Sequence, residues 1–217
     1  MLKLIIGNKN YSSWSLRPWL LMRAKRIQFE ELRISLYGEG SREALRRHSP
    51  SGKVPVLEHG GIVVWDSLAI CEYIAELYPE AGCWPTDTSA RAVARSASAE
   101  MHSGFQALRE ALPMDCRRPP SPKPLDATVQ ADVDRICAIW RSCRERFGAG
   151  GEFLFGGFCI ADAMYAPVVM RFTSYAVSLG DAESAYVSAV RDLPAMREWL
   201  AAAIEEPEVI PLVEAAT

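Results

Sequence analysis

Residues 51–57 of this chain read Ser51-Gly52-Lys53-Val54-Pro55-Val56-Leu57, and they decide the fold that the rest of the sequence adopts. Pro55 lacks an N–H, so it must lie at the start or the edge of a strand. The residue before a proline is pushed toward extended geometry, so Val54 presents its own backbone N–H and C=O to whatever lies alongside. The sequence therefore predicts an open strand edge, with which an extended peptide ligand can pair.

A hairpin and a helix follow this strand. Gly60-Gly61 predicts a turn, residues 62–65 return as a second strand, and Asp66-Ser67 open a helix that Pro79 ends. A helix N-terminus with an acidic residue and a hydroxyl offers donors for a carboxylate and an acceptor for an amine. An amino-acid-like ligand suits this arrangement.

The composition excludes two classes of partner. The 217 residues are 49% hydrophobic, which is ample for a sizeable core in one large or two modest domains. The formal net charge is −3, with 24 basic and 27 acidic residues interspersed, so neither nucleic acid nor an anionic membrane surface is expected as a partner. The apolar run at residues 2–6 is too short for a signal peptide or a membrane span. We expect a soluble, cytoplasmic protein.

The six cysteines form no Cys-x-x-Cys pair, and the three histidines are scattered without metal-ligand spacing. In a chain of this size without an export signal, such cysteines read as reduced thiols that lie mostly in the core. No metal is expected.

Three hydroxyl side chains lie at the first junction between a strand and a helix. Residues 2–7 form a short buried-strand pattern, residues 8–10 form a turn, and Tyr11-Ser12-Ser13-Trp14-Ser15-Leu16-Arg17-Pro18 leads into a helix. Backbone N–H groups and the helix dipole favour an anion at such a junction. For an isolated pattern of this kind, capping of the helix by the same serines is the ordinary interpretation.

Taken in order, these segments resemble the cytosolic glutathione transferases, and specifically a bacterial, serine-type member. The segments SGKVPVL and WDSLAICEYI look like the glutathione-binding half of that family. The resemblance implies that Pro55 is cis and that Val54 pairs through its backbone with the cysteinyl part of glutathione. It also implies that Asp66 and Ser67 hold the γ-glutamyl end. Lys53 would neutralise the glycyl carboxylate, as in tau-like relatives, and a solvent-exposed loop lysine is the alternative.

The segment SSWSLRPWLL resembles the Ser-Ser-Cys-Ser-x-Arg of the zeta class and the Ser-x-x-x-x-Arg of the tau and phi classes. Counting back five positions from Arg17 places the catalytic hydroxyl, which would stabilise the glutathione thiolate, at Ser12. Ser13 and Ser15 are then expected to cap or pack. Trp14 stands where zeta enzymes have a cysteine, which argues against the zeta isomerase activity.

The whole chain fits the architecture that the resemblance implies. We expect a thioredoxin-like α/β domain at residues 1–80, a linker at 81–88 and an all-helical C-terminal domain at 89–217. Helices are expected at 89–112, 129–147, 158–175 and 194–206, followed by a partly extended tail to Thr217. Cys159 replaces the Ser/Thr of the family's capping box, so the cap that it shares with Asp162 should be weaker.

Two classes of function compete at this point. One is a glutathione transferase that adds the glutathione thiolate to a small hydrophobic electrophile, with a maleylacetoacetate-isomerase-like activity as the alternative. The other is a transferase fold kept as a non-catalytic binding or regulatory protein. A thiol-disulfide reductase would need a cysteine at the first junction, and none precedes Cys71. The resemblance also implies a homodimer.

The acceptor cannot be derived from the residues, but four side chains are candidates for an apolar acceptor pocket between the two domains. Side chains of these types at helical spacing also occur in ordinary cores. The four candidates are Trp14, Met101, Phe105 and Met114.

Overall fold

Four strands form one sheet in the N-terminal half, in the order β2-β1-β3-β4. The computed structural model describes residues 1–36 and 38–210. Strand β2 runs parallel to β1, whereas β3 lies antiparallel to β1 and β4 antiparallel to β3. The predicted hairpin is therefore present, and Gly60 and Gly61 make its turn with φ of 55° and 85°. The strands are β1 (Lys3–Ile6), β2 (Glu30–Arg33), β3 (Val56–His59) and β4 (Ile62–Trp65).

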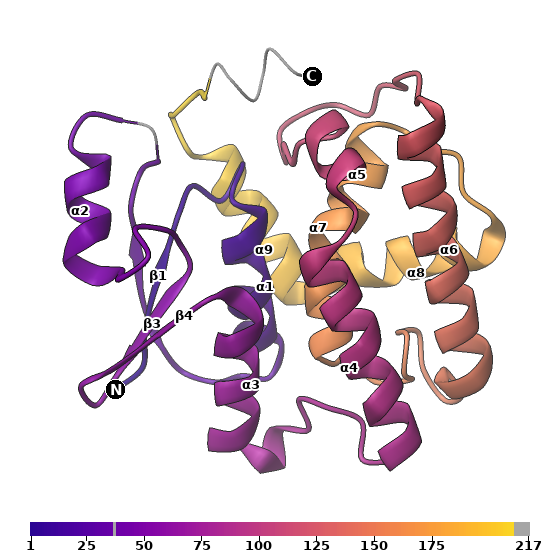
Figure 1. Cartoon of the computed structure of the whole chain (residues 1–217), viewed down its shortest axis with the longest axis horizontal. Helices are drawn as coiled ribbons and strands as arrows, with labels where there is room; N and C mark the ends of the chain where they lie inside the picture. Colours follow the sequence, from indigo (N-terminus) through magenta and orange to yellow (C-terminus); the bar gives the residue numbers. More distant parts are fainter. Residues whose placement is uncertain (37, 211–217) are drawn as a thin grey trace.

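Helices cover both faces of this sheet. Successive side chains of a strand point to opposite faces, so neighbouring residues of β1 pack against different helices. Leu4 and Ile6 of β1 belong to the main core on the side of α1 (Ser13–Ala24) and α3 (Ser67–Leu77). Ile5, between them, packs in a smaller cluster that also contains residues 34, 45 and 56, and α2 (Ser41–His48) supplies Leu45 to it (Figure 1). This arrangement is the thioredoxin-like fold that the sequence predicts.

In the second half, the regular elements of the described residues 81–210 are all helices. Helix α7 is buried on nearly all sides, and it packs against α1 of the first half and against α4 (Figure 1). One core therefore runs through both halves, and the division at residues 80 and 88 stays a prediction. The elements are the short 3₁₀ turn η1 (Pro79–Ala81) and the helices α4 (Thr88–Ser103), α5 (Gln106–Ala111), α6 (Ala127–Phe147), α7 (Ile160–Ser174), α8 (Asp181–Asp192) and α9 (Pro194–Ile204).

The prediction of one helix across residues 89–112 is wrong. Helix α4 ends at Ser103, Phe105 takes the left-handed conformation with φ of 60°, and α5 starts anew at Gln106. The Arg109 guanidinium reaches back and donates to the carbonyls of Met101 and His102. A side chain of α5 therefore satisfies carbonyl groups in the last turn of α4, where the helix leaves them without partners.

One further helix was not predicted, and one predicted segment lies outside the described residues. Helix α8 was not predicted, although Tyr186, Ala189 and Val190 give it a buried face at helical spacing. The expected extended tail from 211 to Thr217 lies outside the described residues.

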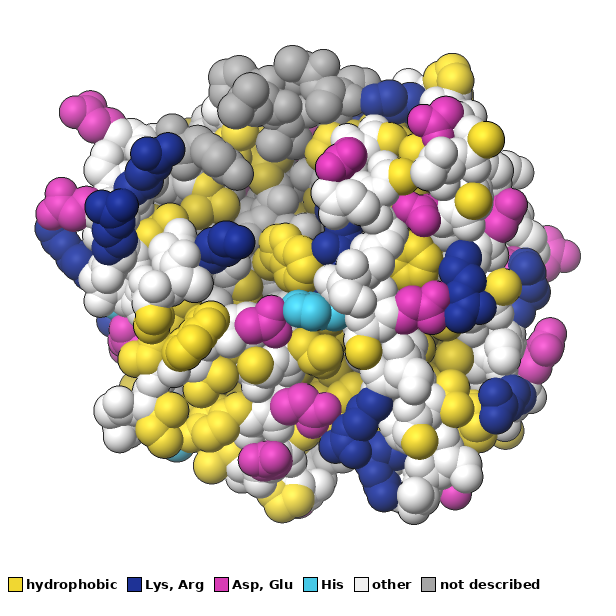
Figure 2. Space-filling view, viewed as in Figure 1, with side chains coloured by type: hydrophobic (Ala, Val, Ile, Leu, Met, Phe, Trp, Pro, Cys, Tyr) yellow, Lys and Arg dark blue, Asp and Glu magenta, His cyan; other side chains and the backbone are white. Residues whose placement is uncertain are grey.

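In the part of the chain that is described, no helix has the length and apolar character needed to cross a membrane. Acidic and basic side chains are interspersed over the face seen in Figure 2.

Candidate functional site

A cavity of about 380 Å³ lies beside the loop that precedes β3 and the start of α3. Five residues predicted for the ligand site line it, together with Trp14, which was predicted for the acceptor pocket. The structure therefore brings together the start of α1, the loop before β3 and the junction of β4 with α3. The lining residues are Trp14, Ser51, Lys53, Val54, Pro55, Trp65, Asp66 and Ser67.

The loop at one wall of this cavity is held by Ser49. The Ser49 hydroxyl donates to the carbonyl oxygen of Lys53 at 2.7 Å and accepts the N–H of Lys53 at 3.1 Å. The Val54–Pro55 peptide bond is cis, as the resemblance implies. Pairing of β3 with β1 starts only at Val56, so Val54 lies just before the paired part of the strand.

Asp66 caps α3 and also bonds to the second half of the chain. Its Oδ1 accepts the N–H groups of Leu68 at 2.9 Å and Ala69 at 3.1 Å. Its Oδ2 lies 3.0 Å from Nε2 of His102, on α4. The neighbouring Ser67 hydroxyl is buried and has no hydrogen-bond partner among the described residues. Since a buried donor without a partner is costly, this hydroxyl is suited to a polar group of a ligand in the cavity.

The charge of His102 depends on what surrounds it. Burial lowers its pKa below the ordinary value of 6.5, and Arg17 and Arg109 lower it further, while Asp66 acts in the opposite direction. The imidazole is therefore neutral at pH 7, and its Nε2–H donates to the Asp66 carboxylate. The contact is therefore a hydrogen bond from a neutral histidine and not an ion pair.

Ser12 is the N-cap residue of α1, and its hydroxyl lies in a short chain of hydrogen bonds. Its Oγ donates to Oγ of Ser15 at 2.8 Å, and Ser15 Oγ also accepts the N–H of Gly7 at 3.1 Å. Ser12 is 6% exposed and Ser15 is fully buried, whereas Ser13 is half-buried. Ser12 lies outside the set that lines the cavity, although Trp14 of the same helical turn lines it.

Two guanidinium groups lie against the ring of Trp14. The Cζ atoms of Arg17 and Arg109 are 4.3 Å and 4.8 Å from its centroid, and His102 meets the ring edge-on at 5.3 Å. Arg17 is 2% exposed, and its Nε and Nη1 find no hydrogen-bond partner in the described part of the chain. Burial lowers the pKa of Arg17 to about 9, with Arg109 and Arg171 adding to the effect.

The remaining candidates for an acceptor pocket lie in the core. Met101, Phe105 and Met114 are 1%, 8% and 2% exposed and belong to the main hydrophobic cluster. None of the three lines the 380 Å³ cavity. Their assignment to an acceptor pocket stays a prediction.

Comparison with known proteins gives the relationship of this chain. The sequence profile described as "Glutathione S-transferase, N-terminal domain" matches residues 11–77, the segment that carries the site. Residues 11–77 are therefore similar to the N-terminal domain of the glutathione S-transferases. The matched segment includes the serine cluster, the Val54–Pro55 bond and the Asp66 cap.

This chain matches curated relatives over part of its length. It is 35% identical over 97 residues to a probable maleylacetoacetate isomerase of Caenorhabditis elegans, with 45% of each chain covered. It is 34% identical over 108 residues to glutathione S-transferase 1 of Dianthus caryophyllus, with 49% of each covered. The match thus spans about half the length of these relatives.

Solved glutathione transferases share the fold along almost the whole chain. A Burkholderia glutathione transferase homologue with bound glutathione superposes with a TM-score of 0.72 at 21% identity, covering 94% of this chain and 99% of that one. A glutathione transferase of Populus trichocarpa gives 0.71 at 16% identity, covering 95% and 100%. Identities this low establish the fold alone. Among the described residues, no group of three His, Cys, Asp or Glu side chains could hold a metal ion.

Several residues around the site could not be identified from the sequence. In the sequence, Arg17 was only the reference position from which Ser12 was located. His102 was only one of three histidines without metal-ligand spacing. Ser49, which holds the Lys53 backbone, carries the Ser-Pro turn signal directly before the loop. The contacts of His102 and Arg109 with Trp14 join different elements, so no short-range pattern indicates them.

Proposed function

We propose that this protein is a glutathione transferase that binds glutathione in the cavity beside Val54 and adds its thiolate to a small hydrophobic electrophile. The observation that carries the proposal is the juxtaposition of the unpartnered Ser67 hydroxyl with the Asp66 carboxylate at the N-terminus of α3. An α-amino acid end needs both a donor and an anion. The bound glutathione of the Burkholderia homologue supports the same ligand class.

Each part of glutathione has a matching group in the cavity. The γ-glutamyl carboxylate would accept from Ser67 and the N-terminal amides of α3, and its ammonium would meet Asp66. The Val54 backbone would pair with the cysteinyl unit. Lys53 is exposed and lines the cavity, so its ammonium can approach the glycyl carboxylate.

Ser12 would act on the sulfur by rotating its hydroxyl from Ser15 Oγ toward the thiolate. A free thiol has a pKa of about 8.5, so ionising most of it at neutral pH needs roughly 2.7 kcal/mol. A hydrogen bond to a charged partner contributes about 1.5 to 3 kcal/mol and a helix N-terminus about 0.3 to 1 kcal/mol. Hydroxyl and helix are therefore sufficient without a general base. The buried Arg17 cation lies five positions after Ser12 and adds positive potential in this region.

The test is a titration of the bound thiolate by its ultraviolet absorbance. Ser12→Ala should raise the thiol pKa and lower turnover at neutral pH, while Ser13→Ala should change neither. Ser15→Ala controls for the hydrogen-bond chain, because it removes the acceptor that Ser12 now uses. An unchanged pKa in Ser12→Ala, together with a raised one in Ser13→Ala, would move the role to Ser13.

Isomerisation of a maleyl-type substrate is the second candidate, because several curated relatives are named as maleylacetoacetate isomerases. It uses the same glutathione site, so a substrate panel separates it from transfer to aryl halides. Trp14 fills the position of the zeta-class cysteine and is packed against two guanidinium groups. A non-catalytic module would show neither glutathione retention nor turnover with any member of the panel.

Assembly and location form part of the same proposal. The edge strand β4 exposes Ile62 and Trp65, 53% and 50% exposed, beside the cavity, which supports a homodimer through this face. A sedimentation mass near 24.0 kDa, that of one chain, would count against it. The six cysteines carry free thiols, which supports a reducing cytoplasmic location. A role in detoxification would follow from conjugation of foreign electrophiles.

A further inference from the structure

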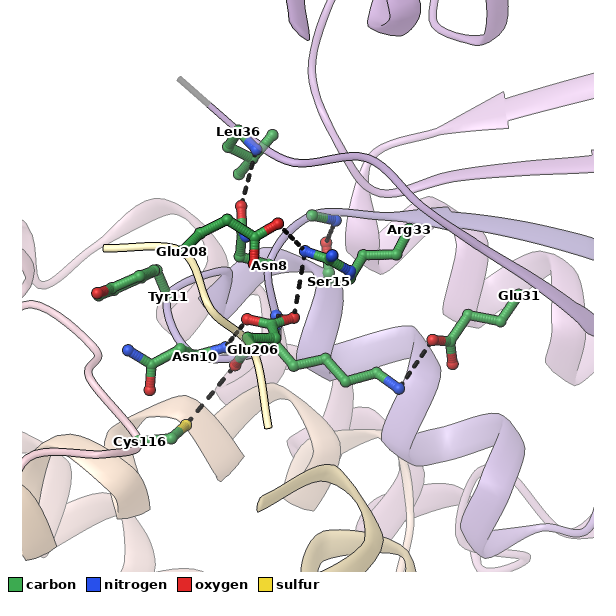
Figure 3. A network of polar contacts seen from close by, with 12 residues as sticks. Asn8, Asn10, Tyr11, Ser15, Glu31, Arg33, Leu36, Cys116, Glu206 and Glu208 are labelled. Carbon is green, nitrogen blue, oxygen red and sulfur yellow. Dashed lines mark hydrogen bonds and ion pairs between the residues drawn. The ribbon is translucent and has the colours of Figure 1, made fainter. Parts of the chain in front are cut away.

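The turn at residues 8–11, directly before Ser12, is held by residues from the far end of the chain. Figure 3 shows the Glu206 carboxylate lying between Arg33 and the turn that carries Asn8 and Asn10. Glu206 follows α9, near the end of the described chain. The turn belongs to the first half of the molecule, so its geometry depends on both halves.

The Glu206 carboxylate binds two consecutive backbone amides of this turn. Its Oε1 accepts the N–H of Lys9 at 2.6 Å, and its Oε2 accepts the N–H of Asn10 at 3.1 Å. Glu206 is only 7% exposed, so these bonds are protected from water. Two charge-assisted bonds from one carboxylate fix the orientation of two consecutive peptide units, Asn8–Lys9 and Lys9–Asn10.

The carbonyl groups of the same two residues are bound as well. Nε1 of Trp199 donates to the Lys9 carbonyl at 2.9 Å, and the Cys116 amide donates to the Asn10 carbonyl at 3.2 Å. The Asn10 side chain donates to Asp115 at 2.9 Å. Donors and acceptors from two separate segments of the second half thus fix the backbone on both sides of the Lys9–Asn10 peptide.

The turn is bonded directly to Ser12. The Ser12 amide donates to the Asn8 carbonyl at 2.8 Å and the Tyr11 amide donates to the same oxygen at 3.2 Å, so the turn ends at the α1 cap. We propose that Glu206 is a positioning residue that sets the place of the Ser12 hydroxyl through the amides of Lys9 and Asn10. The proposal rests on the proposed function of Ser12. Glu206 is not among the residues that line the cavity.

Glu206→Gln is the test, because glutamine keeps the shape but offers one acceptor oxygen, and its NH₂ group must face the other amide. Glu208→Gln is the matched control. Glu208 lies two positions further on and pairs with Arg33 at 2.7 Å, while Arg33 lies 3.7 Å from Glu206, so both variants remove a negative charge beside the same arginine. Only the first touches the turn.

We expect kcat of Glu206→Gln to fall by about tenfold or more at neutral pH, since a small misplacement of a reacting group is costly. Its kcat profile should move to higher pH as the bound thiol becomes harder to ionise, with KM for glutathione nearly unchanged. Glu208→Gln should match wild type in all three. Equal kcat and pH profiles in the two variants would overturn the proposal.

Trp199→Phe provides a second route if Glu206→Gln does not fold. It removes the N–H that binds the Lys9 carbonyl but keeps an aromatic ring against Trp19. The same shift of the pH profile is expected, and Trp84→Phe, which loses an equivalent bond to Glu72 away from the turn, should show none. Wild type that neither binds immobilised glutathione nor turns over would refute the proposed function instead.

Discussion

Oδ2 of Asp66 and Nε2 of His102 lie 3.0 Å apart, so the residue proposed to hold the ligand's ammonium is already bonded to α4 of the second half. Oδ1 of the same carboxylate is occupied by two amides of α3. The carboxylate is therefore oriented before a ligand arrives. A ligand ammonium must share Oδ2 with the imidazole or displace it.

Asp66→Asn should weaken glutathione binding by about tenfold or more, since a hydrogen bond to a charged partner contributes about 1.5 to 3 kcal/mol. The amide oxygen can still cap α3, so the fold is kept. Turnover at saturating glutathione should fall much less, because the lost contact stabilises ground state and transition state alike. Calorimetric Kd values and kcat check this, with Asp87→Asn at the cap of α4 as control. An unchanged Kd would contradict the assignment.

His102 should make the stability of the protein sensitive to acid. Because folding lowers its pKa, the unfolded chain binds more protons below the unfolded pKa of about 6.5. The stabilising contribution is complete above that pH and is lost as the pH falls. Wild type should therefore lose more unfolding free energy than His102→Gln between about pH 8 and about pH 5.5, measured by urea denaturation. Parallel stability curves would show that Asp66 offsets burial and the neighbouring Arg17 and Arg109.

Lys53→Met should reduce glutathione affinity by up to about fivefold, the range expected for a solvent-exposed ion pair. The salt dependence of Kd should weaken at the same time, because exposed charges are screened. Lys3→Met on β1 is the control, since Lys3 is absent from the lining of the cavity. Identical affinities and salt dependence in Lys53→Met and wild type would leave Lys53 as an ordinary loop lysine.

Cys159→Ser should stabilise the protein by up to about 1 kcal/mol, which corresponds to a melting temperature higher by roughly 2 to 4 °C. The Asp162 carboxylate already accepts the Cys159 amide at 2.8 Å, and only the reciprocal acceptor is a poor one, a thiol. Cys143→Ser places the same hydroxyl in the core without a cap and should destabilise. Equal losses in both variants, measured by differential scanning calorimetry, would show that burial of the hydroxyl outweighs the cap.

Features with a local cause could be predicted from the sequence. The missing N–H of Pro55 marked the start of β3, the two glycines marked the hairpin turn, and Asp66 marked the cap of α3. The structure brings Lys53, Val54, Pro55 and Ser67 to one cavity with Trp14, which the sequence had assigned to an acceptor pocket. That these residues bind glutathione remains a proposal.

Features that depend on distant contacts could not be predicted. The break between α4 and α5 needs a residue in the left-handed conformation at Phe105 and the reach of Arg109 to the end of α4, and neither is visible in helical periodicity. The bond between His102 and Asp66 likewise joins elements that only the fold brings together. Sequence patterns indicate which residues form a helix more readily than which helices meet.

The bond between Lys9 and Glu206 joins positions 197 residues apart. Domains fold as units from the N-terminus while a ribosome is still adding residues at about 5 to 20 per second. The sheet and its covering helices leave the ribosome long before Glu206, so at that stage the turn before Ser12 lacks the carboxylate that binds its amides. The turn before Ser12, and with it the position proposed for the Ser12 hydroxyl, is thus among the last features to be fixed on a nascent chain, so a product that ends before Glu206 lacks the two bonds to this turn.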